Sequence, residues 1–213
     1  MEPVRLDFLS ELGFSTRLLA DVKKRIAQGY TGFKLPDKIT CPAGTMRCLL
    51  LFRFNESQAS LILEQYEAML QAEIKITHQV LEQMDTRALE TMMADIDWNA
   101  HEFTRAFLLQ FGRPDEVLEE KVQAVSLALK QLSDMGEAGH TIAGQLRLKY
   151  WYDTSFSRDY MNIPGFESLA RRYYPGRVVT AAQGLITVQQ MYEVLLKDRE
   201  QGLTGGRRRS RRR

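Results

Sequence analysis

MRCLLLFRF (residues 46–54) is followed directly by NESQASLILEQYEAMLQAEIKITHQVLEQM (residues 55–84), and these two segments decide the expected fold. The first segment can form a strand with one apolar side and one side bracketed by arginines. The apolar side holds Cys48, Leu50, Phe52 and Phe54, and the other holds Arg47, Leu49, Leu51 and Arg53. The second segment contains no Gly or Pro and its apolar residues return at helical spacing, at Ala59, Ile62, Leu63, Tyr66, Leu70, Ile74, Val80, Leu81 and Met84. We therefore predict a strand followed by helical structure that Asn55 caps.

The apolar stripe of residues 55–84 is interrupted at Glu73 and Lys75, which leaves open whether this segment is one helix or two. A strand, a helix, a break and a second helix is the layout of ribbon-helix-helix proteins, in which strands paired between two copies enter the major groove of DNA. The alternative is an edge strand that covers a long helix. The ribbon-helix-helix interpretation spans residues 46–85. It assigns to DNA the residues Arg47, Leu49, Arg53, Lys75 and Thr77.

The rest of the chain reinforces a mainly helical prediction. Further helices are expected at residues 15–29, 85–96, 99–112, 115–136 and 187–202 from their caps and apolar spacing. Ser15 or Thr16 is expected to cap the first of these, and Thr187 with Gln190 the last. Residues 30–45 are expected to be irregular because they contain Gly32, Pro36, Pro42 and Gly44. The alternation at Val4, Leu6 and Phe8 allows either a strand or a helix. We predict a mostly α fold, an α+β domain of one or two short strands and about seven helices over residues 1–202.

Charge is distributed unevenly along the chain. The formal net charge of +2 combines 23 basic and 27 acidic residues in 1–206 with six arginines in the terminal segment RRRSRRR (207–213). We expect a disordered tail from residue 203 that neutralises phosphates and binds nucleic acid without sequence preference. The alternative is a tail that aids solubility or binds a protein partner. The tail residues assigned to DNA are Arg207, Arg208, Arg209, Arg211, Arg212 and Arg213.

Aromatic and basic side chains are interleaved between residues 147 and 177. Stacking and phosphate contact would suit such a region, but aromatic residues also dominate ordinary cores, and the sequence leaves both interpretations open. A row formed by Tyr150, Trp151 and Tyr152 would favour an RNA-binding module. The basic residues of the region that we assign to nucleic acid are Arg147, Lys149, Arg171 and Arg172.

Catalytic signatures are missing from the sequence. It contains no glycine-rich phosphate loop, no GxSxG and no HExxH, and its three histidines are far apart. Asp95, Asp97, His101 and Glu102 come nearest to a set of metal ligands, but a cap at Asn99 explains part of the pattern. Cys41 and Cys48 lack metal or redox spacing. We expect no enzyme, metal or cofactor, and, because no signal peptide or long apolar run is evident, a cytoplasmic protein.

Three segments are similar to parts of one known family. They are TMRCLLLFRFN (45–55) with ASLILEQYEAML (59–70), FSTRLLADVKKRI (14–26) and GEAGHTIAGQLRLKYWYDTSFSRDY (136–160). The chain in these segments resembles the AcaB-like family, which is encoded on integrating conjugative elements and large conjugative plasmids. The resemblance implies a bacterial, cytoplasmic transcriptional regulator with a ribbon-helix-helix element that acts as a dimer on conjugation or mobilisation genes.

Residue patterns and resemblance together favour a DNA-binding regulator or accessory protein of a mobile genetic element, acting as a homodimer. Two other functions remain open at this stage. One is a helical interaction or assembly protein of a conjugation system, whose tail binds nucleic acid or acidic surfaces loosely. The other is an RNA-binding module that uses residues 147–177.

Overall fold

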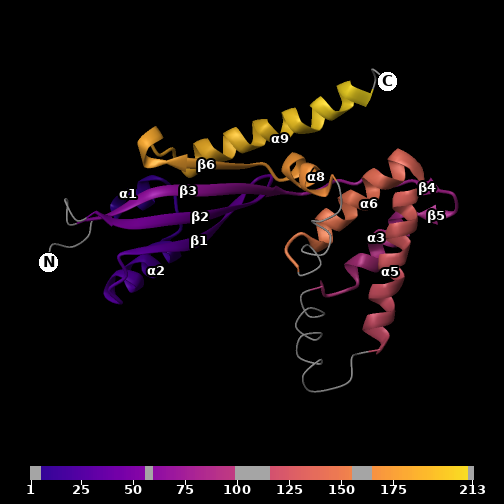
Figure 1. Cartoon of the computed structure of the whole chain (residues 1–213), viewed down its shortest axis with the longest axis horizontal. Helices are drawn as coiled ribbons and strands as arrows, with labels where there is room; N and C mark the ends of the chain where they lie inside the picture. Colours follow the sequence, from indigo (N-terminus) through magenta and orange to yellow (C-terminus); the bar gives the residue numbers. More distant parts are fainter. Residues whose placement is uncertain (1–5, 56–59, 99–115, 155–164, 211–213) are drawn as a thin grey trace. The chain divides into compact units, whose positions relative to one another are not determined.

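The computed structural model describes residues 6–55, 60–98, 116–154 and 165–210 of the 213. The chain divides into two compact units, which we describe separately (Figure 1). Unit 1 comprises Met1–Glu73 and Arg171–Arg213, and unit 2 comprises Ile74–Ala170. From the sequence we predict a single domain over residues 1–202.

Unit 1 is built on a four-stranded antiparallel sheet with the order β1-β2-β3-β6. Its strands are β1 (Gly32–Cys41), β2 (Gly44–Asn55), β3 (Ser60–Ala72) and β6 (Gly176–Thr180). The prediction of a mostly α fold with one or two short strands is therefore wrong. The protein is an α+β protein whose longest strands are longer than most helices of unit 1.

The largest error concerns residues 55–84, which were predicted to be helical. Residues 60–72 form β3 instead, and its buried residues alternate except at one point. Leu51 pairs with Gln65 while Phe52 pairs with Leu63, so Glu64 is an extra residue in the strand, a β-bulge. Because of the bulge, the buried residues Leu63 and Tyr66 are three positions apart in the sequence. Tyr66 and the buried Leu70 are four positions apart, since each two-residue repeat of a strand returns to the same face. Spacings of three and four imitate a helix.

The ribbon-helix-helix interpretation fails for the same reason. Strand β2 was correctly predicted, and Cys48, Leu50 and Phe52 are buried on its apolar side. However, β2 pairs with β1 along one edge and with β3 along the other. Both of its edges are occupied, so it cannot pair with a second copy. No helix follows it directly among the described residues.

Residues 30–45 were wrongly predicted to be irregular. Gly32–Cys41 forms β1, which lies at the edge of the sheet. An edge strand tolerates Pro36 because one of its sides needs no ladder hydrogen bond. Gly44, at φ 151°, follows the turn into β2 and lies so close to Gln71 that a Cβ there would clash with the Gln71 carbonyl oxygen.

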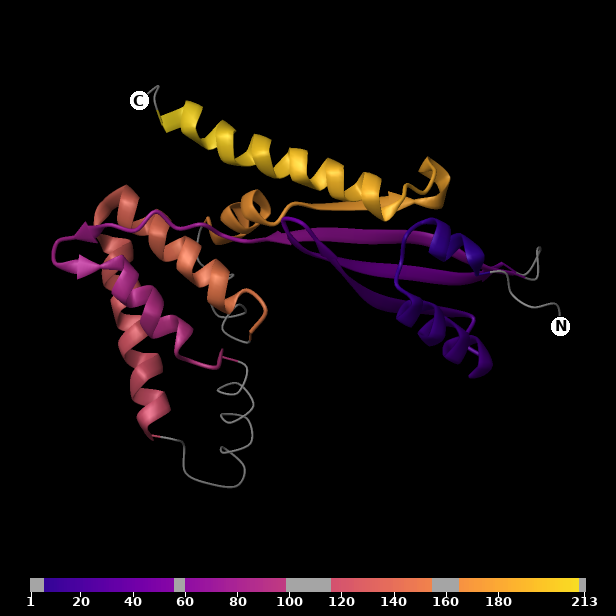
Figure 2. The same ribbon diagram turned by 180° about the vertical axis from the view of Figure 1, so that it is seen from behind.

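One face of the sheet is covered by helices α1 (Asp7–Glu11), α2 (Thr16–Ala27) and α9 (Val188–Ser210). Figures 1 and 2 show α9 running along the β6 side of the sheet. The core between the helices and the sheet includes Leu9, Leu18, Val22, Met46, Leu50, Phe52, Tyr66, Leu70, Met191 and Leu195. The N-terminal alternation near Phe8, which allowed a strand or a helix, is resolved as helix α1.

Two helix caps predicted from sequence are confirmed. Ser15 caps α2, since its hydroxyl accepts a hydrogen bond from the Leu18 N–H at 3.1 Å. Thr187 and Gln190 form the expected pair at the start of α9. Helix α9 continues to Ser210, whereas a disordered tail was expected from residue 203, so the backbone of residues 207–209 is helical. Residues 211–213 lie outside the described residues.

Unit 2 is mainly helical. It contains the short strands β4 (Val80–Leu81) and β5 (Met84–Asp85) and the helices α3 (Thr86–Ala94), α5 (Glu116–Asp134) and α6 (Gly136–Trp151). Helix α8 (Phe166–Tyr173) begins in unit 2 and ends in unit 1, and a 3-10 turn, η2 (Ala181–Gln183), follows β6. The helices predicted at 85–96 and 115–136 are confirmed, while the one predicted at 99–112 lies outside the described residues.

Candidate functional site

The second face of the unit 1 sheet is a candidate functional surface, which we call the open face. Residues at alternate positions of each strand point away from the helices and face this side. They are Lys34, Pro36, Lys38 and Thr40 of β1, Thr45, Arg47, Leu49, Leu51 and Arg53 of β2, Ile62, Gln65, Glu67, Met69 and Gln71 of β3, and Val178 and Thr180 of β6. None of these residues belongs to the buried core of unit 1.

The open face has an aliphatic centre. Pro36, Leu49, Glu67 and Val178 lie in one row across the four strands. Leu49 is 37% exposed and Val178 is 49% exposed, and Pro36 is also exposed. Half-buried Leu51, Ile62 and Met69 extend the aliphatic surface along the strands. None of the open-face residues defined above is aromatic.

Charge on the open face is divided between strands. Basic side chains lie on β1 and β2, where Lys34, Lys38, Arg47 and Arg53 occur, and the acidic Glu67 lies on β3. Glu64, the bulge residue of β3, forms an ion pair with Arg53, whose Nε lies 2.9 Å from the Glu64 Oε2. The guanidinium of Arg53 is 65% exposed, so this ion pair contributes little to stability.

Basic residues also occur where α8 lies against α9. Arg171 and Arg172 are exposed in the last turn of α8. Gly202 of α9 lies against Arg172, because a Cβ built on Gly202 would be 3.3 Å from the Arg172 Cγ and 3.6 Å from its Cα. Arg207 follows Gly202 by five residues of helix, or about 7.5 Å along the axis. We call Arg171, Arg172 and the arginines at 207–209 the C-terminal basic cluster, because Arg172, next to Arg171 in α8, lies beside Gly202, and the backbone of residues 207–209 continues the same helix as Gly202.

Formal charge differs sharply between the units. Unit 1 contains 20 Lys and Arg residues against 12 Asp and Glu, a net charge of +8. Unit 2 contains 9 against 15, a net charge of −6, and the two values sum to the +2 of the whole chain. Six of the basic residues of unit 1 belong to the terminal segment 207–213.

The predicted DNA-binding residues do not form one surface. Arg47, Leu49 and Arg53 are together on the open face of unit 1. Lys75 and Thr77 belong to unit 2 and are exposed in a segment without regular structure, not at the start of a helix. Sequence reasoning also missed Lys34, Lys38 and Val178. The alternation of Lys34 and Lys38 around Pro36 was a usable signal, but the prolines and glycines nearby obscured it.

Arg147 is wrongly assigned to nucleic acid. Its side chain is 7% exposed and donates hydrogen bonds to the Ser133 hydroxyl and the Leu129 carbonyl oxygen, both at 3.0 Å. It therefore joins α6 to the last turns of α5, where a cation also suits the helix dipole. A side chain used in this way cannot contact a phosphate.

The interleaved aromatic residues of α6 are mainly core. Trp151 is fully buried and packs edge to face on Trp98, with ring centroids 5.3 Å apart. Tyr150 and Tyr152 are half-buried. Because its central ring is inaccessible, the row Tyr150, Trp151 and Tyr152 is not a stacking surface for bases, and it gives no support to the alternative of an RNA-binding module at residues 147–177.

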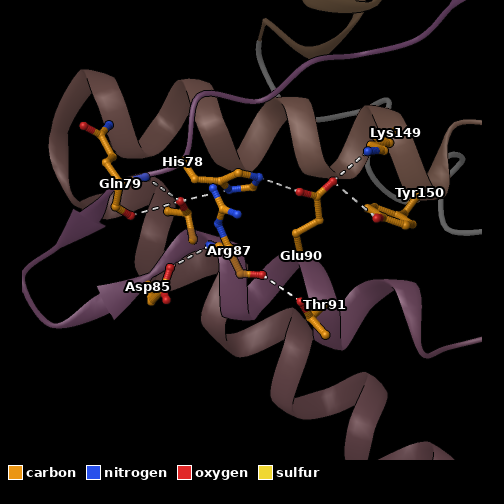
Figure 3. A network of polar contacts seen from close by, with 9 residues as sticks. His78, Gln79, Asp85, Arg87, Glu90, Thr91, Lys149 and Tyr150 are labelled. Carbon is orange, nitrogen blue, oxygen red and sulfur yellow. Dashed lines mark hydrogen bonds and ion pairs between the residues drawn. The ribbon is translucent and has the colours of Figure 1, made fainter.

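Lys149 belongs to a polar network in unit 2 (Figure 3). Glu90 of α3 contacts the Lys149 ammonium and the His78 Nε2, both at 2.7 Å, and accepts a 3.3 Å hydrogen bond from the Tyr150 hydroxyl. The other ring nitrogen of His78 lies 3.4 Å from the Thr86 hydroxyl. Burial raises the pKa of Glu90, but hydrogen bonding and charge from Lys149, with the charge of His78, outweigh it and lower the pKa overall.

This network connects the segment before β4 with α3 and α6, and its polar atoms have their partners within unit 2. Both nitrogens of His78 and both oxygens of Glu90 have partners in unit 2, so neither side chain offers an open position for a substrate or a metal. Burial raises the pKa of the Tyr150 hydroxyl, and the negative charge of Glu90 adds to the effect. The network therefore serves to hold the segment before β4 against α3 and α6.

The described residues show neither a group of metal-ligating side chains nor a helix that is long and apolar enough to cross a membrane. His101 and Glu102 of the proposed ligand set lie outside the described residues. Neither a protein-family model, nor a curated protein, nor a solved structure matches this chain. The class of the protein is thus defined by its fold, an α+β protein with a four-stranded antiparallel sheet covered on one face, and its resemblance to the AcaB-like family stays a prediction.

Proposed function

We propose that this protein binds nucleic acid through the C-terminal basic cluster, with duplex DNA as the favoured polymer. The observation that carries the proposal is the contact between Gly202 and Arg172, which places the arginine pair of α8 beside the helix that continues into the arginine run. Basic residues close together in a chain neutralise several phosphates and release condensed counterions. The mechanism gives affinity and orientation without reading bases.

Duplex DNA is favoured for two reasons. Its charge density along the axis is higher than that of a single strand, so counterion release per bound cation is greater. Single-stranded nucleic acid is usually held by rows of exposed aromatic rings, and neither the open face nor the Trp151 region supplies such a row among the described residues. The ribbon in the major groove is not part of this proposal.

Within this proposal, the chain acts as a DNA-binding regulator or accessory protein of a mobile genetic element. The support for that role is the resemblance of three sequence segments to the AcaB-like family. Because phosphate contacts carry no sequence information, a regulator of this kind would depend on a partner protein or on further residues to select its sites.

Fluorescence anisotropy with duplex, single-stranded and RNA probes across a salt series tests the proposal. Replacing the six arginines of residues 207–213 by Gln should reduce the slope of log affinity against log salt by about 5, at about 0.9 per lost phosphate contact. Replacing Arg171 and Arg172 by Gln should reduce it further, by up to about 2. Affinity should fall for every duplex sequence alike.

The matched control is Lys121→Gln with Lys130→Gln, which removes two exposed cations from α5 in unit 2. This variant should bind like the unmodified chain if the cluster, and not net charge, is responsible. Equal losses in the control and in the Arg171 and Arg172 variant would contradict the proposal. So would tight binding of the six-arginine variant to duplex DNA at physiological salt.

A further inference from the structure

The open face carries more aliphatic surface than a sheet face in water requires. A half-buried antiparallel sheet normally alternates, with apolar residues toward the core and polar residues toward solvent. On this sheet Leu49, at 37% exposure, and Val178, at 49%, interrupt that rule, with Leu51, Ile62 and Met69 beside them. Glu67 separates Leu49 from Val178 in their row, so the aliphatic surface is centred on Leu49, and an exposed aliphatic surface with a charged rim marks a site of protein association.

We propose that the open face is the interface between two copies of this chain, packed face to face with their strands aligned. The proposal is independent of the function proposed above, which uses the C-terminal basic cluster. It also differs from the ribbon dimer expected from sequence, in which strands of two copies would pair through their edges.

The edges of the sheet are poorly suited to association. The outer strand β1 carries Pro36, which lacks an N–H, between the exposed Lys34 and Lys38. Proline and lysine on an edge strand are devices that prevent pairing with another strand. At the other edge, β6 has only five residues, Gly176–Thr180. Association of two sheets is therefore expected through a face.

Charge on the two strands that flank β2 is complementary between copies. If a two-fold axis runs along β2, each β1 lies over the β3 of the other copy. The β2 residues Arg47, Leu49 and Arg53 then meet their own equivalents, and Arg53 is paired with Glu64 of its own copy. Pro36, Leu49 and Glu67 share a row, so the Glu67 of one copy faces Pro36 of the other. Lys34 and Lys38 are two residues to either side of Pro36 and thus flank that carboxylate. A two-fold interface requires this kind of self-complementarity.

The size of the face is sufficient for a dimer. The strands β1 and β2 are paired over ten positions, Gly32 to Cys41. At ~3.4 Å per residue and ~4.8 Å per strand, three strands cover a footprint of ~490 Å² in each copy. The two copies would bury roughly 1,000 Å² together, which is the lower limit for a specific interface. We therefore expect a dimer that dissociates on dilution.

Other occupants fit less well. A single-stranded nucleic acid would find basic residues here, but no aromatic ring among the open-face residues on which to stack. Binding of a different protein would not explain why Glu67 and the pair Lys34 and Lys38, which belong to the same chain, have opposite charges at positions that face each other in the dimer. The second copy is the occupant favoured by the match between Glu67 of β3 and the two lysines of β1.

Sedimentation velocity of the full chain over a wide concentration range is the first test. The unmodified chain should form a dimer, and Leu49→Glu should raise its dissociation constant by about a hundredfold, as expected for a central contact. The matched control is Leu127→Glu, since Leu127 of α5 is 58% exposed and lies in unit 2. A chain that is monomeric at every concentration, or a dimer that survives Leu49→Glu, overturns the proposal.

Charge reversal gives a second test that does not depend on Leu49. Glu67→Lys alone, and Lys34→Glu with Lys38→Glu alone, should each weaken the dimer at least tenfold. Mixing the two variants should restore it, because each contact then joins opposite charges. No recovery in the mixture overturns the proposed packing. Weaker nucleic-acid binding by Leu49→Glu, with no change in mass, would assign the face to nucleic acid and overturn it as well.

Discussion

Unit 1 and unit 2 differ in both architecture and charge. In unit 1 a sheet is covered by helices on one face only, and the net charge is +8. In unit 2 helices bury a core around two tryptophans, Trp98 and Trp151, and the net charge is −6.

The surfaces suited to association, which are the open face and the C-terminal basic cluster, occur in unit 1. In unit 2, the polar residues of the His78–Glu90 network form hydrogen bonds and ion pairs with each other. A segment rich in charged and aromatic residues is thus not a binding surface unless the fold leaves it exposed.

The largest expected effect is a loss of stability confined to the core of unit 2. Trp151→Ala should destabilise unit 2 by about 3–5 kcal/mol, because Trp151 is fully buried against Trp98. Both tryptophans of the chain lie in unit 2, so their fluorescence during denaturant unfolding reports on that unit alone. Phe52→Ala, at a fully buried position of unit 1, is the matched variant and should leave the fluorescence transition in place. If both substitutions shift it equally, the two units unfold as one.

A smaller effect is expected where α2 joins the sheet. Asp37 of β1 is 7% exposed, and its carboxylate accepts hydrogen bonds from the Ser15 N–H at 2.9 Å and the Ser15 hydroxyl at 2.6 Å. Asp37→Ala should lower the free energy of unfolding of unit 1 by about 2–3 kcal/mol, since buried donors lose a charged acceptor. Circular dichroism during chemical unfolding measures it. As a control, Asp21→Ala in α2 should change the free energy of unfolding by less than about 0.5 kcal/mol. If it destabilises unit 1 as much as Asp37→Ala does, the hydrogen bonds between Ser15 and Asp37 are not the cause of the loss.

The third prediction concerns pH and unit 2. The pKa of Glu90 is lowered in the folded state, so the unfolded chain binds more protons near its ordinary pKa of 4.5. The stabilisation by Glu90 is present above that pH and is lost as the pH falls through the lowered value. Glu90→Gln should remove about 1–2 kcal/mol at neutral pH and flatten the acid limb of stability, measured by tryptophan fluorescence.

The control for that measurement is Glu120→Gln, at an exposed position of α5. It should retain the acid-dependent loss of stability seen in the unmodified chain. An acid limb that is unchanged in Glu90→Gln would show that the network is not its source.

The smallest effect is expected at the ion pair between β6 and α9. Arg177 donates two hydrogen bonds to Asp198, at 2.7 and 3.0 Å, and this interaction lowers the pKa of the Asp198 carboxyl. The Arg177 side chain is 56% exposed, so solvent and salt screen the pair. Arg177→Ala should therefore reduce the thermal stability of unit 1 by no more than about 1 kcal/mol, and less at high salt. A loss several times larger would mean that the pair is essential for docking α9.

Much of the local structure could be predicted from sequence. The caps at Ser15 and Thr187, the strand from residue 46 to 54 and the helices near 85–96 and 115–136 depend on short-range patterns, and the structure confirms them. Of the candidate site, Arg47, Leu49 and Arg53 were correctly placed on one side of a strand. The residues that share that surface on β1 and β6 could not be found, because strand partners are distant in sequence.

The sequence by itself determined the alternation of β2, the ends of several helices and the concentration of arginine at the C-terminus. Only the tertiary structure decided that residues 60–72 are a strand, since a bulge at Glu64 gives its apolar residues the spacing of a helix. Pairing also decided that β2 is enclosed by β1 and β3, and packing decided that Arg147 is buried while Arg172 is exposed. Periodicity describes one segment at a time, whereas exposure and pairing depend on which distant segments it meets.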